Sequence, residues 1–209
     1  ACYLEDLKAK AIIVATGYDG PARRVAKRFD MIVIELTASN PAGSFTLSAT
    51  ATGSAADTVP ASDDVALILH TSGTTSRPKI VPLLQSNVAA SAVNVRESLA
   101  LTRDDCCLNV MPLFHIHGLI AAVSGSLAAG ASISCAPGFD ALKFYGWLEE
   151  VDPSWYTAVP TMHQAILARA PRNAAIIENA RLRFLRSSSS SLPGPVMTEL
   201  AETFGAPVV

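Results

Sequence analysis

Short runs of β-branched and apolar residues alternate with segments of helical period along most of the chain. Two such runs, residues 11–16 and 31–36, flank a helical segment that opens at Pro21, a first-turn position where the missing N–H of proline costs nothing. The alternation continues with expected strands at 65–69, 106–111, 131–136, 155–159 and 182–186, and expected helices at 85–101, 119–129, 140–150, from 161, and at 195–204. Parallel strands joined through helices bury both faces of their sheet. We therefore expect an α/β fold with largely parallel sheets covered by helices on both faces.

One stretch interrupts this alternation. Residues 37–62 are rich in Ser, Thr, Ala, Gly and Pro and show little periodicity, so we expect a flexible linker there. The first residue is not Met, and residues 205–209 read as the beginning of an apolar strand. We therefore expect residues 1–209 to be a fragment of a longer protein.

The composition excludes several classes of protein. Half of the 209 residues are hydrophobic and 16% are charged, which provides a core and argues against disorder. A formal net charge of -2 gives no basic surplus for nucleic acid. The four cysteines show no CxxC pair, so we expect a reduced, cytoplasmic protein without a metal site. Serines and glycines interrupt the apolar stretch 118–136, which favours a buried helix and strand over a membrane span.

The chemistry is expected in the segment HTSGTTSRPKIVP, residues 70–82. It follows an expected strand and combines several hydroxyl side chains with Gly73 and Lys79. Hydroxyls and backbone N–H groups bind phosphate oxygens directionally, and glycine allows the backbone to approach them closely. Lysine supplies a compensating positive charge. A phosphate-binding loop is favoured over a solvated Ser/Thr-rich loop. The Walker A motif is excluded, because it needs glycine where this chain has Pro78.

The segment resembles the phosphate loop of the adenylate-forming superfamily, [ST]-S-G-[ST]-T-G-x-P-K-G, which includes acyl-CoA synthetases. Three further segments resemble this family in the same order: MPLFHIHG (111–118), WYTAVPT (155–161) and RSSSSSLP (186–193). Ser76 and Ile80 replace glycines of the family pattern, and at either position glycine can supply a backbone conformation that other residues resist. The combination of the motifs T-S-G-T-T-S-R-P-K and F-H-[IV]-H-G resembles oxalate–CoA ligases and their close relatives.

The resemblance implies that residues 1–209 are part of the N-terminal domain of an acyl-CoA synthetase, without its C-terminal domain and inactive alone. It implies ATP, Mg²⁺ and CoA as cofactors and a small carboxylic acid as substrate, with no membrane span; the sequence leaves the oligomeric state open. His115 is expected in a catalytic position beside the acyl carboxylate. The residues expected to contact the nucleotide are Thr71, Ser72, Gly73, Thr74, Thr75, Lys79, Ser189 and Ser190.

Ser189 and Ser190 fall where the family has Gly or Ala facing the acyl chain and the adenine. Because a buried hydroxyl without a partner costs about 1–3 kcal/mol, these serines favour a polar acid such as oxalate or malonate. A medium-chain or aromatic acid, and a non-catalytic ATP- or AMP-binding module, remain alternatives. The sequence does not separate function from packing for His117, and it favours packing for His163.

Overall fold

The computed structural model describes residues 4, 6–49, 59–71 and 79–209. The chain divides into two units. Unit 1 comprises residues 1–60 and 70–80, and unit 2 comprises residues 61–69 and 81–209. Strands β4 (Val65–Thr71) and β5 (Lys79–Leu84) pair in a two-stranded sheet.

Unit 1 contains a three-stranded sheet in the order β1-β2-β3, with the bounds β1 (Ala11–Ala15), β2 (Ile32–Ser39) and β3 (Ser44–Leu47). Strands β1 and β2 are parallel and are connected through α2 (Pro21–Arg28), as the sequence predicted. Helix α2 is tied to β2 by an ion pair between Arg23 and Glu35.

The prediction of a flexible linker at residues 37–62 is wrong for residues 37–47. Strand β2 continues through Ser39, and β3 pairs with it antiparallel, with Thr37 opposite Thr46 and Ala38 opposite Phe45. The turn between them contains Pro41 and Gly43, and Gly43 has a φ of 90°. Small polar residues on a half-exposed hairpin hide the period-two pattern that marks a strand, because neither face is uniformly apolar.

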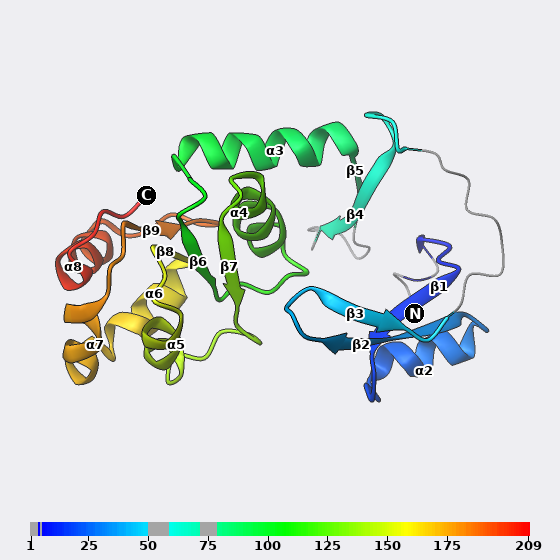
Figure 1. Cartoon of the computed structure of the whole chain (residues 1–209), viewed down its shortest axis with the longest axis horizontal. Coiled ribbons are helices and arrows are strands. Elements are labelled where there is room, and N and C mark those ends of the chain that lie inside the picture. Colours follow the sequence, from blue (N-terminus) through cyan, green and yellow to red (C-terminus); the bar gives the residue numbers. More distant parts are fainter. Residues whose placement is uncertain (1–3, 5, 50–58, 72–78) are drawn as a thin grey trace. The chain divides into compact units, whose positions relative to one another are not determined.

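Unit 2 is built on a four-stranded parallel sheet in the order β7-β6-β8-β9 (Figure 1). Its strands are β6 (Cys106–Asn109), β7 (Ser132–Cys135), β8 (Trp155–Ala158) and β9 (Phe184–Ser187). Its helices are α3 (Gln85–Ser98), η1 (His117–Ser124), α4 (Gly125–Ala128), α5 (Phe144–Val151), α6 (Pro160–Leu167), η2 (Ala170–Asn173), α7 (Ala174–Asn179) and α8 (Gly194–Phe204).

Alternation along the strands sends side chains into two separate cores. Tyr156 of β8 and Leu185 of β9 pack with residues of α5, α6 and α8 on one face. Their neighbours Trp155 and Phe184 stack at 5.2 Å between ring centroids, on the face that also buries Ala122 of η1. Strands β8 and β9 therefore contribute apolar side chains to both faces, and the prediction of a parallel sheet covered on both sides is confirmed. Among the described residues, no helix is long and apolar enough to span a membrane.

Candidate functional site

Unit 2 contains a cavity of about 420 Å³ beside the carboxyl end of β9. In parallel α/β sheets, ligands bind outside the carboxyl ends of the strands, where connecting loops supply the contacts. The cavity is formed by the beginning of η1 and by the residues that end and follow β9. It is lined by His115, Ile116, His117, Ile120, Ala121, Arg186, Ser188 and Ser189.

The turn after β6 fixes where η1 begins. The side chain of Asn109 donates to the carbonyl of Met111 at 3.2 Å and accepts from the Met111 N–H at 3.1 Å. Gly118 lies against this turn, because a Cβ there would meet the carbonyl oxygen of Pro112 at 2.6 Å. The glycine of the F-H-I-H-G segment therefore permits the close approach that places His117 at the cavity.

Replacing Gly118 by alanine is expected to lower the free energy of unfolding by about 2 kcal/mol, since overpacking against a backbone atom cannot be relieved by a side-chain rotation. Gly138→Ala is the matched control, because a Cβ there meets nothing within 4 Å. Urea unfolding of both variants checks this. Equal midpoints for the two variants would show that η1 shifts without cost.

His117 is buried at the wall of the cavity, where the residue is only 3% exposed. Its Nε2 lies 2.6 Å from the hydroxyl of Thr157, and its Nδ1 lies 3.1 Å from the hydroxyl of Ser189. Burial lowers the pKa of His117 to about 4, and the positive charge of Arg186 acts in the same direction. His117 is therefore neutral at pH 7, with one ring nitrogen donating and the other accepting.

Arg186 brings a positive charge to the same cavity from β9. Its guanidinium donates to the hydroxyl of Thr157 at 3.4 Å and to that of Ser188 at 3.5 Å, both at the long limit for a hydrogen bond. Burial lowers the pKa of Arg186. None of the ion pairs within the described part of the chain includes this arginine. The cavity therefore carries a half-buried cation whose described partners are neutral hydroxyls.

His163 is fully buried on α6 and does not line the cavity. Its Nδ1 lies 3.2 Å from the hydroxyl of Tyr156, and its Nε2 lies 3.3 Å from the carbonyl oxygen of Arg186. Burial lowers the pKa of His163 to about 4. This is a packed core histidine, which is the reading that the sequence favoured.

The structure brings together two of the three residues expected around the acyl group. His115 lines the cavity, and its Nδ1 accepts the backbone N–H of His117 at 3.1 Å. Ser189 also lines it, with a positive φ of 75°. Ser190 is exposed and is not part of the lining. Sequence reasoning missed Arg186 and Ser188 as site residues; the only available signal was their position inside the R-S-S-S-S-S-L-P segment.

The expected phosphate loop lies mostly outside the described residues, since Ser72, Gly73, Thr74 and Thr75 fall in the gap between residues 71 and 79. Its two ends belong to unit 1. Thr71 ends β4 and Lys79 begins β5, and both side chains are exposed. The loop's role in binding phosphate therefore stays a prediction from the sequence.

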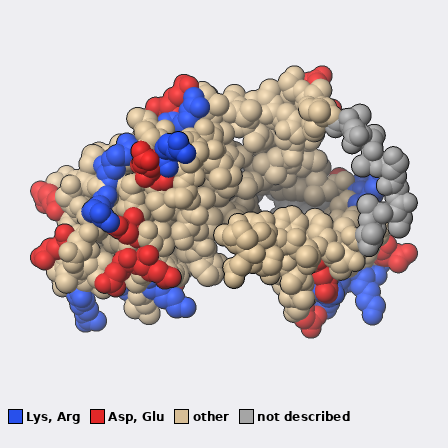
Figure 2. Space-filling model, viewed as in Figure 1, with Lys and Arg blue, Asp and Glu red and all other residues tan. Residues whose placement is uncertain are grey.

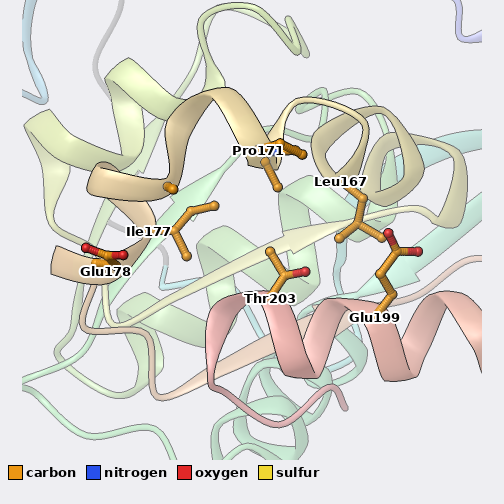
Figure 3. A pocket seen from close by; sticks show the side chains of 8 residues that line it. Leu167, Pro171, Ile177, Glu178, Glu199 and Thr203 are labelled. Carbon is orange, nitrogen blue, oxygen red and sulfur yellow. The ribbon is translucent and has the colours of Figure 1, made fainter.

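A second hollow of about 350 Å³ lies between α6, α7 and α8 (Figure 3). Leu167, Pro171 and Ile177 give it an apolar wall, and Glu178 and Glu199 also line it. Among the described residues that line it there is no histidine, lysine or arginine, so it offers an anionic substrate no positive charge. On the face of the molecule seen in Figure 2, acidic and basic side chains are intermixed. Within the described residues, no three His, Cys, Asp or Glu side chains form a group that could hold a metal ion.

A parallel sheet covered on both faces, with a polar cavity at the carboxyl end of one strand, defines an α/β ligand-binding domain. Comparison with protein families makes the assignment specific. The model of AMP-binding enzymes matches residues 1–209, so this chain belongs to the AMP-binding enzyme family. The resemblance read from the sequence motifs is confirmed.

Curated relatives include two oxalate–CoA ligases. The chain is 40% identical over 213 residues to the enzyme of Arabidopsis thaliana, covering 99% of this chain and 41% of that one. It is 39% identical over 148 residues to the enzyme of Saccharomyces cerevisiae, covering 71% of this chain and 26% of that one. The chain therefore spans well under half the length of these relatives. An indoleacetate–CoA ligase of Aromatoleum aromaticum is 33% identical over 143 residues, covering 68% of this chain and 28% of that one.

Solved structures of similar fold include ATP-bound MatB from Rhodopseudomonas palustris, with a TM-score of 0.74 and 25% identity over 99% of this chain and 40% of that one. A malonyl-CoA ligase in complex with methylmalonyl-CoA and AMP superposes with a TM-score of 0.77 at 22% identity, covering 99% of this chain and 42% of that one. The second likeness supports the fold alone. Together they confirm the α/β architecture expected from the alternating pattern.

Proposed function

We propose that the full-length protein is an AMP-forming acyl-CoA ligase that activates a small polar carboxylic acid such as oxalate. The acid's carboxylate attacks the α-phosphate of ATP, which releases pyrophosphate and leaves an acyl-adenylate. The thiolate of CoA then attacks the acyl carbon and displaces AMP. The observation that carries the choice of acid is the cavity, in which Arg186, Ser188 and Ser189 present donors where an aliphatic tail would need an apolar wall.

In this proposal the protein acts by positioning and electrostatics, because the attacking group belongs to the substrate. His115 and Ser189 would contact the acyl carboxylate, and Ser190 would approach the adenine. The phosphate groups of ATP would be held by Thr71, Ser72, Gly73, Thr74, Thr75 and Lys79. Mg²⁺ would enter as a partner of the ATP phosphates, as it usually does when one or two carboxylates and the phosphates hold it together.

A medium-chain or aromatic acid is the second candidate, and one feature of the cavity favours it. Ile116, Ile120 and Ala121 form one of its sides, and such a surface would accept an apolar chain or ring. Among the relatives, an indoleacetate–CoA ligase acts on an aromatic acid, going by its name. A non-catalytic nucleotide-binding module is the remaining alternative.

The test follows pyrophosphate release by the full-length protein with ATP, Mg²⁺ and CoA. The acids are oxalate, malonate, octanoate and benzoate. Turnover with oxalate or malonate alone supports the proposal. Turnover confined to octanoate or benzoate would support the proposed reaction but would contradict the proposal that the substrate is a small polar acid. ATP binding without pyrophosphate release from any acid would favour the non-catalytic module.

Lys79→Ala in the full-length protein is expected to lower kcat/KM for ATP by about 100-fold, because a positive charge aimed at the reacting phosphates stabilises the charge that develops there. Lys143→Ala is the matched control, since Lys143 is an exposed lysine that precedes α5 in unit 2. Steady-state kinetics at saturating oxalate and CoA give the comparison. A decrease of less than threefold in kcat/KM for ATP in Lys79→Ala would show that this lysine does not bind the phosphates.

A further inference from the structure

We infer that Arg186 binds the second, non-reacting carboxylate of a dicarboxylic acid and thereby selects diacids over monoacids. The inference rests on the proposed function and names the residue that gives this cavity its substrate class. Four observations carry it: the charge of Arg186, the hydrogen-bond chain beside it, the backbone of Ser189, and the absence of acidic side chains from the lining.

The first observation is an incompletely used guanidinium. A guanidinium has five N–H donors, and within the described part of the chain the side-chain hydrogen bonds of Arg186 go to the hydroxyls of Thr157 and Ser188. Both are long, and both acceptors are neutral. A half-buried cation that has no opposite charge among the described residues is costly to hold, and a carboxylate ligand would offset that cost through a bidentate pair. A cavity built this way is suited to an anion.

The second observation is a hydrogen-bond chain that joins Arg186 to Ser189. The hydroxyl of Thr157 accepts from Arg186 and lies 2.6 Å from Nε2 of His117. Nδ1 of His117 lies 3.1 Å from the hydroxyl of Ser189. In the tautomer of neutral His117 that carries its proton on Nδ1, this nitrogen donates to Ser189, and the proton of Ser189 can then donate to a ligand. This tautomer favours a ligand with acceptor oxygens.

The third observation is the backbone at Ser189. A φ of 75° lies in the left-handed region, which a residue with a Cβ seldom adopts, and it costs of order 1–3 kcal/mol. The bond from His117 holds the Ser189 side chain in this conformation at the cavity wall. Strain of this kind persists where the surrounding contacts over-determine it, and it is common at sites that clamp a ligand.

The last observation concerns what the lining lacks. The described residues that form the cavity include arginine, two serines and two histidines, and none of them is aspartate or glutamate. A carboxylate entering it therefore meets donors and no repulsive charge. When one carboxylate of a diacid reacts with the α-phosphate of ATP, the other keeps its charge and can pair with Arg186. A monoacid leaves this charge unpaired, and unpaired polar groups in a built site are what reject a substrate analogue.

The test compares substrates in the full-length protein and in two variants, Arg186→Met and Arg186→Lys. Oxalate and malonate are the diacids; acetate and butyrate are the monoacids. We expect Arg186→Met to lower kcat/KM for both diacids by about 100-fold, as for a truncated charge pair, and to change the monoacid values by less than about threefold. Arg186→Lys should recover part of the loss, because it restores the charge without the bidentate geometry.

The matched control is Arg181→Met. Arg181 has an 80% exposed side chain, pairs with Asp152 and does not line the cavity, so all kinetic values should stay unchanged. Binding of oxalate to the enzyme with AMP, measured by calorimetry, gives a readout that does not need turnover. If Arg186→Met does not fold, Arg186→Lys carries the test with an expected loss of at least about 10-fold for both diacids.

Two failures are distinguishable. Wild-type enzyme that releases pyrophosphate with monoacids and not with diacids overturns the proposed substrate class and this inference together. Wild-type enzyme that prefers diacids, with the same preference kept in Arg186→Met or Arg186→Lys, overturns the role of Arg186 and leaves the proposed function standing.

Discussion

Replacing Asp105 by alanine is expected to lower the free energy of unfolding of unit 2 by about 3 kcal/mol, because it removes a buried charged acceptor and leaves the hydroxyl of Ser154 without it, while the half-exposed Arg183 can turn to water. Asp105 is 4% exposed and lies immediately before β6. Its carboxylate accepts from the guanidinium of Arg183 at 3.0 and 3.1 Å and from the hydroxyl of Ser154 at 2.7 Å. Arg183 also donates to the carbonyl of Leu99, just beyond α3, at 3.2 Å. One carboxylate therefore joins the N-terminal ends of three strands to the end of a helix.

Asp104→Ala is the matched control, because this neighbouring aspartate is exposed and contacts the Asp105 network through its backbone N–H, which the substitution keeps. Urea unfolding monitored by tryptophan fluorescence reports on unit 2, since both tryptophans, Trp147 and Trp155, belong to it. We expect the control to unfold within about 0.5 kcal/mol of wild type, as exposed substitutions usually do. A similarly small effect for Asp105→Ala would mean that water replaces the lost carboxylate.

The second large effect is a loss of stability in mild acid. Burial lowers the pKa of His117 and of His163 to about 4, from an ordinary value of 6.5. Above pH 6.5 these rings are mostly neutral in both the folded and the unfolded chain, so they do not lower the free energy of unfolding. Between pH 6.5 and about 4 the unfolded chain binds protons that the folded chain does not, so stability falls as the pH falls. We expect the free energy of unfolding to be about 4 kcal/mol lower at pH 5 than at pH 7.5.

The measurement is the tryptophan-monitored urea unfolding of wild type and of His163→Asn at both pH values. Removing one of the two buried rings should halve the difference between pH 7.5 and pH 5, to about 2 kcal/mol, whatever the variant does to stability at pH 7.5. A wild-type difference below about 1 kcal/mol would show that the buried rings gain protons in the folded state. Asp105 contributes only at lower pH. Burial raises the pKa of its carboxyl, but hydrogen bonds from Thr102, Ser154 and Arg183 outweigh this and hold the pKa below its usual range.

The order of the four strands in the parallel sheet of unit 2, and of the longer helices that connect them, followed from the sequence alone. Local pattern was sufficient there because these strands lie in short segments rich in apolar residues and the helices begin near recognisable residues, such as Pro160 for α6 and Asp140 before α5. The sequence analysis did not predict β5, η2 or α7. Local pattern failed at β3, where a short polar hairpin lacks a uniformly apolar face. The motif order also identified the family, since residues 70–82, 111–118, 155–161 and 186–193 are contiguous signals.

The sequence by itself thus determined the α/β class, the family and two members of the cavity, His115 and Ser189. Only the tertiary structure showed that His117 lies within hydrogen-bond distance of both Thr157 and Ser189 and that Arg186 lines the same cavity. These residues come from η1, β8 and the end of β9, far apart in the sequence. Their meeting depends on strand register and on which face each side chain occupies, and neither is encoded in any one segment. The motifs therefore provide the residues of the cavity, and the packing of the sheet decides which of them come together.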